Sequence, residues 1–129
     1  MKKSFWWGIS FIVIIALIWY FMSKPSPYDD FAQCLTDKGT KMYGAYWCPH
    51  CQEQKKLFGS SWDKVTYIEC AIRGSNEPTT ECIKEGIKSY PTWEFADGNK
   101  VPAVLSLQQL SSFTSCDLPE LYKLAPSII

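Results

Sequence analysis

Histidine is nearly absent from this chain of 129 residues, which contains only His50. A metal site formed by His50 with Cys48 and Cys51 is one interpretation, but the remaining cysteines form no second close pair of the zinc-ribbon type. Covalent haem attachment requires a histidine directly after the second cysteine, where Gln52 stands instead. The sequence therefore predicts neither a metal nor a cofactor.

Acidic residues are absent before Asp29, where Lys2, Lys3 and Lys24 are the only charged side chains. All thirteen acidic residues follow, with ten basic ones, so the rest of the chain has a formal charge of −3. This balance gives no indication of nucleic-acid binding. No internal repeat or low-complexity stretch is present, and the roughly 100 residues that remain suit one domain with its own core.

Charge is also missing from the 18 residues between Phe5 and Met22, which form an apolar run. As a helix this run would be roughly 27 Å long, close to the thickness of a bilayer core. The preceding lysines favour a cytoplasmic N-terminus. We expect residues 1–22 to be a single uncleaved transmembrane anchor in a bacterial inner membrane. A cleaved signal peptide is the alternative, although no small-residue cleavage site follows.

The remaining segments are a short linker, residues 23–28, and a domain over residues 29–129. All six cysteines lie in this domain, which fits an oxidising compartment on the periplasmic side of the membrane.

The motif that carries chemistry is Trp47-Cys48-Pro49-His50-Cys51, between a predicted strand and a predicted helix. Its spacing brings both sulfurs within disulfide reach and places only Cys48 at the helix N-terminus, where free N–H groups favour a thiolate. Pro49 is tolerated in the first turn, and a protonated His50 would add positive charge. The motif predicts a redox-active disulfide with Cys48 as nucleophile and Cys51 as resolving thiol.

Hydrophobic periodicity and turn residues predict an alternation of helices and strands after the linker. Helices are expected over residues 29–38, 48–58 and 79–85 and after Ser106, which forms a capping box with Gln109. Strands are expected over residues 41–47, 65–70, 90–95 and 99–104. The predicted class is α/β, with a mixed central sheet and helices on both faces in three layers.

This order of elements resembles the thioredoxin fold. The resemblance is carried by WCPHC after the first strand, the segment Gly86–Thr92 (GIKSYPT) and the Asp97-Gly98 turn. A closer similarity is to the thioredoxin-like domain of bacterial and plant vitamin K epoxide reductase homologues, through residues 31–35, 41–59, 67–70, 82 and 90–93. Those proteins commonly fuse this domain to a four-helix membrane oxidase. The chain looks like an unfused, membrane-tethered partner of such an oxidase.

The resemblance implies roles around the motif. Pro91 would be a cis-proline facing the disulfide, and Tyr90 before it would offer backbone groups to a substrate strand; an ordinary trans proline is the alternative. Trp47 and Tyr90 are therefore expected in a substrate groove. Trp47, Tyr46 and Trp93 form either an apolar rim around the sulfurs or part of the core.

The resemblance also implies a structural disulfide between Cys70 and Cys82, with a second redox-active pair as the alternative. Cys34 and Cys116 stay unassigned. The first and last helices of a thioredoxin fold usually cover opposite faces, which argues against joining these two cysteines.

One position departs from cytoplasmic thioredoxins, which resemble one another in a buried aspartate six residues before the first active-site cysteine. Met42 stands there, so the usual proton acceptor is missing. Glu69 and Glu94 are candidate substitutes, unless these strand carboxylates point to water or to a salt bridge.

The Pro-His pair between the cysteines resembles strongly oxidising exported thiol oxidases. We therefore expect a thiol-disulfide oxidoreductase that passes a disulfide to exported proteins and is reoxidised by a quinone-linked membrane oxidase of the vitamin K epoxide reductase type. The alternatives are a tethered reductase, for example in cytochrome c maturation, and a non-catalytic assembly or binding subunit.

Overall fold

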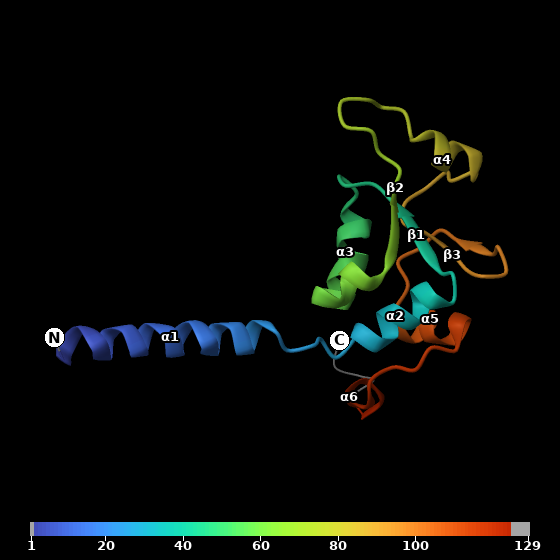
Figure 1. Ribbon diagram of the computed structural model, residues 1–129. Helices are drawn as coiled ribbons and strands as arrows, with labels where there is room; N and C mark the ends of the chain where they lie inside the picture. The colour runs from blue at the N-terminus through green and yellow to red at the C-terminus, as the bar shows by residue number, and fades with distance from the viewer. Residues whose placement is uncertain (1, 125–129) are drawn as a thin grey trace.

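A computed structural model describes residues 2–124 and shows a mixed sheet surrounded by helices (Figure 1). The helices are α1 (Lys2–Met22), α2 (Asp29–Asp37), α3 (Pro49–Phe58), the 3₁₀ helix η1 (Gly59–Lys64), α4 (Thr80–Lys84), α5 (Leu107–Thr114) and α6 (Glu120–Leu124). The strands are β1 (Lys41–Gly44), β2 (Thr66–Glu69), β3 (Thr92–Glu94) and β4 (Lys100–Val101). The last five residues of the domain predicted over 29–129 lie outside the described part.

The four strands are ordered β2-β1-β3-β4, with β1 parallel to β2 and antiparallel to β3, and β3 antiparallel to β4. A mixed sheet is thus present, but its strands are shorter than the sequence predicts. β1 ends at Gly44 rather than Trp47, because residues 45–47 leave the sheet in a turn that leads into α3. This early exit places Cys48 directly before the helix instead of on the sheet.

Alternating side chains divide the sheet into two unequal faces. Met42 and Trp93 point into the larger core cluster, which also contains apolar residues of α2, α3 and α5. Tyr43, next to Met42 on β1, belongs to a smaller cluster with Cys70, Cys82 and Ile87 beside α4. Both faces are therefore covered, but α2 and α5 lie on the same one.

The argument against joining Cys34 and Cys116 is wrong for this chain. The two cysteines form a disulfide that links α2 to the segment after α5 across 82 positions of sequence. Figure 1 shows α2 and α5 next to each other. The reason is that Leu35 of α2 and Leu110 of α5 are both fully buried in the larger core cluster.

The predicted transmembrane helix also requires correction. Within the described part of the chain, no helix is both long enough and apolar enough to cross a membrane. This finding contradicts the fold class that placed a transmembrane helix before the domain.

Gln54 holds α3 in place. Its side chain is fully buried. Its Nε2 donates to the Leu105 carbonyl (2.9 Å), while its Oε1 accepts from Trp93 Nε1 (3.1 Å) and from Leu105 N–H (2.7 Å). Because each buried polar group has a partner, Gln54 ties α3 to β3 and to the segment before α5.

The two disulfides differ in the length of chain they close, and this difference sets an expected order of stabilities. Loop-closure entropy predicts a loss of about 4.5 kcal/mol when Cys34 and Cys116 are both replaced by alanine, against about 3 kcal/mol for Cys70 and Cys82. Urea unfolding of the two double variants measures both free energies. A smaller loss for Cys34→Ala/Cys116→Ala than for Cys70→Ala/Cys82→Ala would contradict the entropic account.

Candidate active site

The two cysteines of the motif lie at the start of α3, where β1 has just ended. Cys48 is the N-cap residue and Pro49 occupies the first turn. The backbone N–H of Cys51 donates to Cys48 Sγ (3.3 Å), and the Cys48 thiol donates to the Tyr90 carbonyl (3.6 Å). Cys48 thus uses its sulfur as a helix cap, and the N–H groups of the first turn point toward it. This is the electrostatic setting that stabilises a thiolate.

The two sulfurs differ in their access to solvent. Cys48 keeps 4% of its surface exposed, while Cys51 is fully buried at 0%. Burial, followed by the hydrogen bond to Cys48, raises the pKa of the Cys51 thiol to about 12. Cys51 therefore stays protonated at neutral pH, and an incoming sulfur can reach only Cys48.

The loop before β3 closes the site opposite Cys48. The Tyr90–Pro91 peptide bond is cis, and the Thr92 hydroxyl donates to the Ser89 carbonyl (2.8 Å) within the same loop. Tyr90 presents its carbonyl to Cys48 Sγ and packs edge-to-face against Trp47, with ring centroids 6.1 Å apart. Trp47 itself is 62% exposed. A client segment that reaches Cys48 would therefore meet these two aromatic rings first.

Of the three aromatic residues considered for a rim, only two reach the surface. Tyr46 and Trp47 are exposed, whereas Trp93 is fully buried and belongs to the core. The Trp93 side chain points from β3 into the larger core cluster. Its indole N–H donates a hydrogen bond to Gln54 Oε1. The rim interpretation is wrong for Trp93.

Two shallow grooves flank Tyr90. The first is bounded by Trp47, Tyr90 and the loop residues 75–78, and the second by His50, Pro91 and Val104. Both are bordered by Tyr90, whose carbonyl accepts a hydrogen bond from the Cys48 thiol, so an extended segment has room on either side of this loop.

His50 stands in the first turn of α3 with its imidazole in the solvent. Its Nδ1 lies 3.5 Å from Glu53 Oε2, and both side chains are exposed. A protonated His50 therefore has a counter-charge one turn further along the same helix. No group of three or more His, Cys, Asp or Glu side chains that could hold a metal ion occurs within the described residues.

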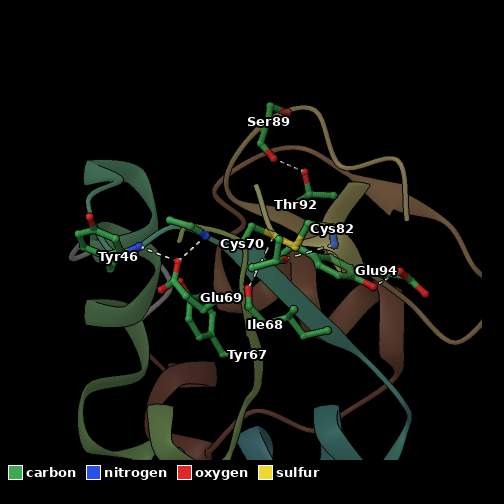
Figure 2. The surroundings of a disulfide bond; sticks show 12 residues. Tyr46, Tyr67, Ile68, Glu69, Cys70, Cys82, Ser89, Thr92 and Glu94 are labelled. Atoms are coloured by element: carbon green, nitrogen blue, oxygen red, sulfur yellow. Dashed lines mark hydrogen bonds between the residues drawn. A yellow bond between two sulfur atoms is a disulfide. The ribbon is translucent and has the colours of Figure 1, made fainter. Parts of the chain in front are cut away.

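Cys70 and Cys82 form a disulfide on the opposite face of the sheet (Figure 2). It connects the end of β2 to α4, whose N-cap Thr79 accepts a hydrogen bond from Cys82 N–H (3.4 Å). Both sulfurs are buried, but Cys70 also borders the first groove. The bond therefore anchors the loop that forms one wall of that groove.

The two candidate carboxylates lie on different faces of the sheet. Glu94 accepts from the Tyr43 hydroxyl (2.9 Å) and pairs with Lys41 (3.3 Å) and Lys100 (3.2 Å), on the face of the sheet opposite Cys48 and Cys51. Glu69 points toward Tyr46 and Tyr67 (Figure 2). It thus lies on the active-site side of the sheet.

The hydrogen bonds of Glu69 lie on the face of the sheet that carries Cys48 and Cys51. Its Oε2 accepts from the Tyr67 hydroxyl (3.0 Å), and its Oε1 accepts from Tyr46 N–H (3.1 Å) and Ala71 N–H (3.0 Å). Tyr67 is a residue that the sequence reasoning missed as part of the site. The signal was available, because residues two apart on a strand share a face and Glu69 was already a candidate.

The chain is similar to a curated protein of known activity. No family model matches the chain. The chain is 36% identical over 103 residues to the thiol-disulfide oxidoreductase LTO1 of Arabidopsis thaliana, an alignment that covers 76% of the chain and 27% of that protein. The chain therefore spans about a quarter of the length of the curated relative it matches. The similarity supports a thioredoxin-like redox protein.

The difference between the two thiols can be measured by alkylation. With the other motif cysteine replaced by serine, we expect iodoacetamide to modify Cys48 at least about a hundredfold faster than Cys51 near pH 8, because a group with a raised pKa supplies little thiolate. Mass spectrometry of the reduced Cys48→Ser and Cys51→Ser variants gives the two rates. In urea the rates should become equal; a fast Cys51 reaction in the folded protein would contradict its burial.

Proposed function

We propose that this chain is a thiol-disulfide oxidoreductase that donates the Cys48–Cys51 disulfide to client proteins. The observation that carries the proposal is a cysteine pair at the start of α3 in which Cys48 keeps a small exposed surface (4%) and Cys51 keeps none. Cys48 caps α3 and accepts a hydrogen bond from Cys51 N–H, while Cys51 is closed to solvent. The similarity to an oxidoreductase over most of this chain supports the same chemistry.

The exchange proceeds in two displacements. A client thiolate attacks Cys48 Sγ of the disulfide, the bond to Cys51 breaks, and Cys51 leaves as a thiolate that takes up a proton. A second client thiolate then attacks the client sulfur of the mixed disulfide and releases Cys48. The client loses two electrons and gains a disulfide, and the protein becomes the dithiol.

The direction of transfer follows from what stabilises the dithiol. Cys51 N–H bonds to Cys48 Sγ, and the unpaired N–H groups at the start of α3 favour negative charge there. A reduced form stabilised in this way makes the disulfide a stronger oxidant. We therefore propose that the protein oxidises client thiols rather than reducing client disulfides.

We place the clients among exported proteins and the reoxidation step at a quinone-linked membrane oxidase of the vitamin K epoxide reductase type. That oxidase would accept two electrons from the Cys48–Cys51 dithiol and pass them to a quinone. The sequence resemblance supports this partner, and the two further disulfides support an oxidising compartment. Clients would bind as extended segments in the grooves beside Tyr90, with Trp47 against their apolar side chains.

An oxidant of this kind should show a measurable exchange activity and a characteristic reduction potential of the Cys48–Cys51 disulfide. The wild-type disulfide should oxidise a reduced, unfolded protein, with a reduction potential closer to that of strong dithiol oxidants, about −120 mV, than to thioredoxin at about −270 mV. Equilibration with glutathione measures the potential, and Cys48→Ser should abolish exchange.

The matched control is Cys34→Ala/Cys116→Ala, which removes another disulfide but leaves the motif intact and should keep the exchange rate. A potential near −270 mV would instead favour the reductase. Wild-type protein without any exchange activity would favour a non-catalytic binding module.

A further inference from the structure

We propose that Tyr67 and Glu69 form a proton relay for Cys51, in which the Tyr67 hydroxyl accepts the Cys51 proton and passes its own proton to Glu69. This inference rests on the proposed function, because it concerns the resolving step of disulfide exchange. It assigns the proton acceptor that the sequence leaves open at Met42.

Gly44 shows how close the groups of the relay lie. A Cβ built on this residue would lie 3.0 Å from Cys51 Sγ and 3.1 Å from Tyr67 Oη, so these two atoms are no more than about 6 Å apart. That distance can be spanned by a single bridging water. The absence of a side chain at Gly44 is what allows the phenol and the sulfur to face each other.

Glu69 is built to receive a proton from Tyr67. The Tyr67 hydroxyl donates to its Oε2 (3.0 Å), which orients the phenol so that a lone pair of the hydroxyl oxygen is free for another donor. Its Oε1 is held by Tyr46 N–H and Ala71 N–H. The carboxylate is therefore held next to Tyr46, which lies two residues before Cys48.

One nearby charge favours ionisation of Cys51, against the burial that raises its pKa. Lys55 Nζ lies 3.9 Å from the centre of the Tyr67 ring, and its charge stabilises a thiolate at Cys51. Burial, followed by the hydrogen bond to Glu69, raises the pKa of Tyr67, so the phenol conducts a proton without losing it at neutral pH. Cys48 and Tyr90 are further titratable groups that interact with Cys51.

The balanced step in the direction of protein oxidation is as follows. With a mixed disulfide on Cys48, the Cys51 S–H proton moves to Tyr67 Oη as the Tyr67 proton moves to Glu69, giving a Cys51 thiolate and a neutral carboxyl. The thiolate attacks Cys48 Sγ, the Cys48–Cys51 bond forms, and the bound group leaves as a thiolate with the electron pair of the broken bond. In the donating direction, Glu69 returns the proton to Cys51.

The test separates the two displacements by oxidising the reduced protein with dithiobis(nitrobenzoate) in a stopped-flow instrument. Each displacement releases one coloured thionitrobenzoate, first when Cys48 attacks the reagent and then when Cys51 attacks Cys48. Tyr67→Phe removes the hydroxyl but keeps the ring, and Glu69→Gln keeps an acceptor for the two N–H groups but is not basic.

We expect both variants to slow the second release by at least about tenfold near pH 7, with the first release within about twofold of wild type. The variants should then speed up about tenfold per pH unit, because hydroxide must remove the proton directly, and approach the wild-type rate at high pH. A structural role alone would not produce this profile.

The chain supplies a matched control on the other face of the sheet. The Tyr43 hydroxyl donates to Glu94 Oε2 (2.9 Å), which is also a tyrosine–glutamate hydrogen bond, but on the face opposite Cys51. Tyr43→Phe and Glu94→Gln should therefore leave both thionitrobenzoate releases at wild-type rates. A second release in Tyr67→Phe and Glu69→Gln that equals wild type at every pH would overturn the relay alone. A wild-type protein that releases no thionitrobenzoate would overturn the proposed function instead.

Discussion

The hydrogen bond from the Cys51 N–H to Cys48 Sγ is the contact on which the site depends. It exists because β1 ends at Gly44 and the chain turns sharply, so that Cys48 becomes the cap of α3 rather than a strand residue. The same turn directs Cys51 into the core, where burial keeps its proton in place. One local geometry therefore creates both the reactive sulfur and the protected one.

The rest of the domain keeps α3 from moving relative to the loop that carries Tyr90. Gln54 joins the helix to β3 through the Trp93 indole and to the segment before α5 through Leu105. Removing such a group would leave buried polar atoms without partners, at a cost of about 1–3 kcal/mol for each. β3 begins directly after Pro91. The hydrogen bond between Gln54 and Trp93 of β3 therefore also helps to fix the position of the Tyr90 carbonyl relative to Cys48.

The two carboxylates on the strands show how the sheet assigns roles by face. Glu69 and Glu94 are both hydrogen-bonded to a tyrosine hydroxyl. Glu94 forms ion pairs with Lys41 and Lys100 on the face of the sheet opposite Cys48 and Cys51. Glu69 lies on the face of Cys48 and Cys51, where a carboxylate can exchange protons. Their chemistry is alike, and their positions alone make one a candidate for the reaction.

Local pattern was enough to predict the order of α-helices and strands from α2 to α5, the capping box at Ser106 and Gln109, and the placement of Cys48 at the start of a helix, because these depend on residues close together in the chain. It did not predict η1 or α6. The pairing of Cys34 with Cys116, the burial of Gln54 and of Trp93, and the approach of Tyr67 to Cys51 depend on segments far apart in sequence. Only the folded structure decides these, since a polar or aromatic side chain gains its role from the neighbours that packing brings to it.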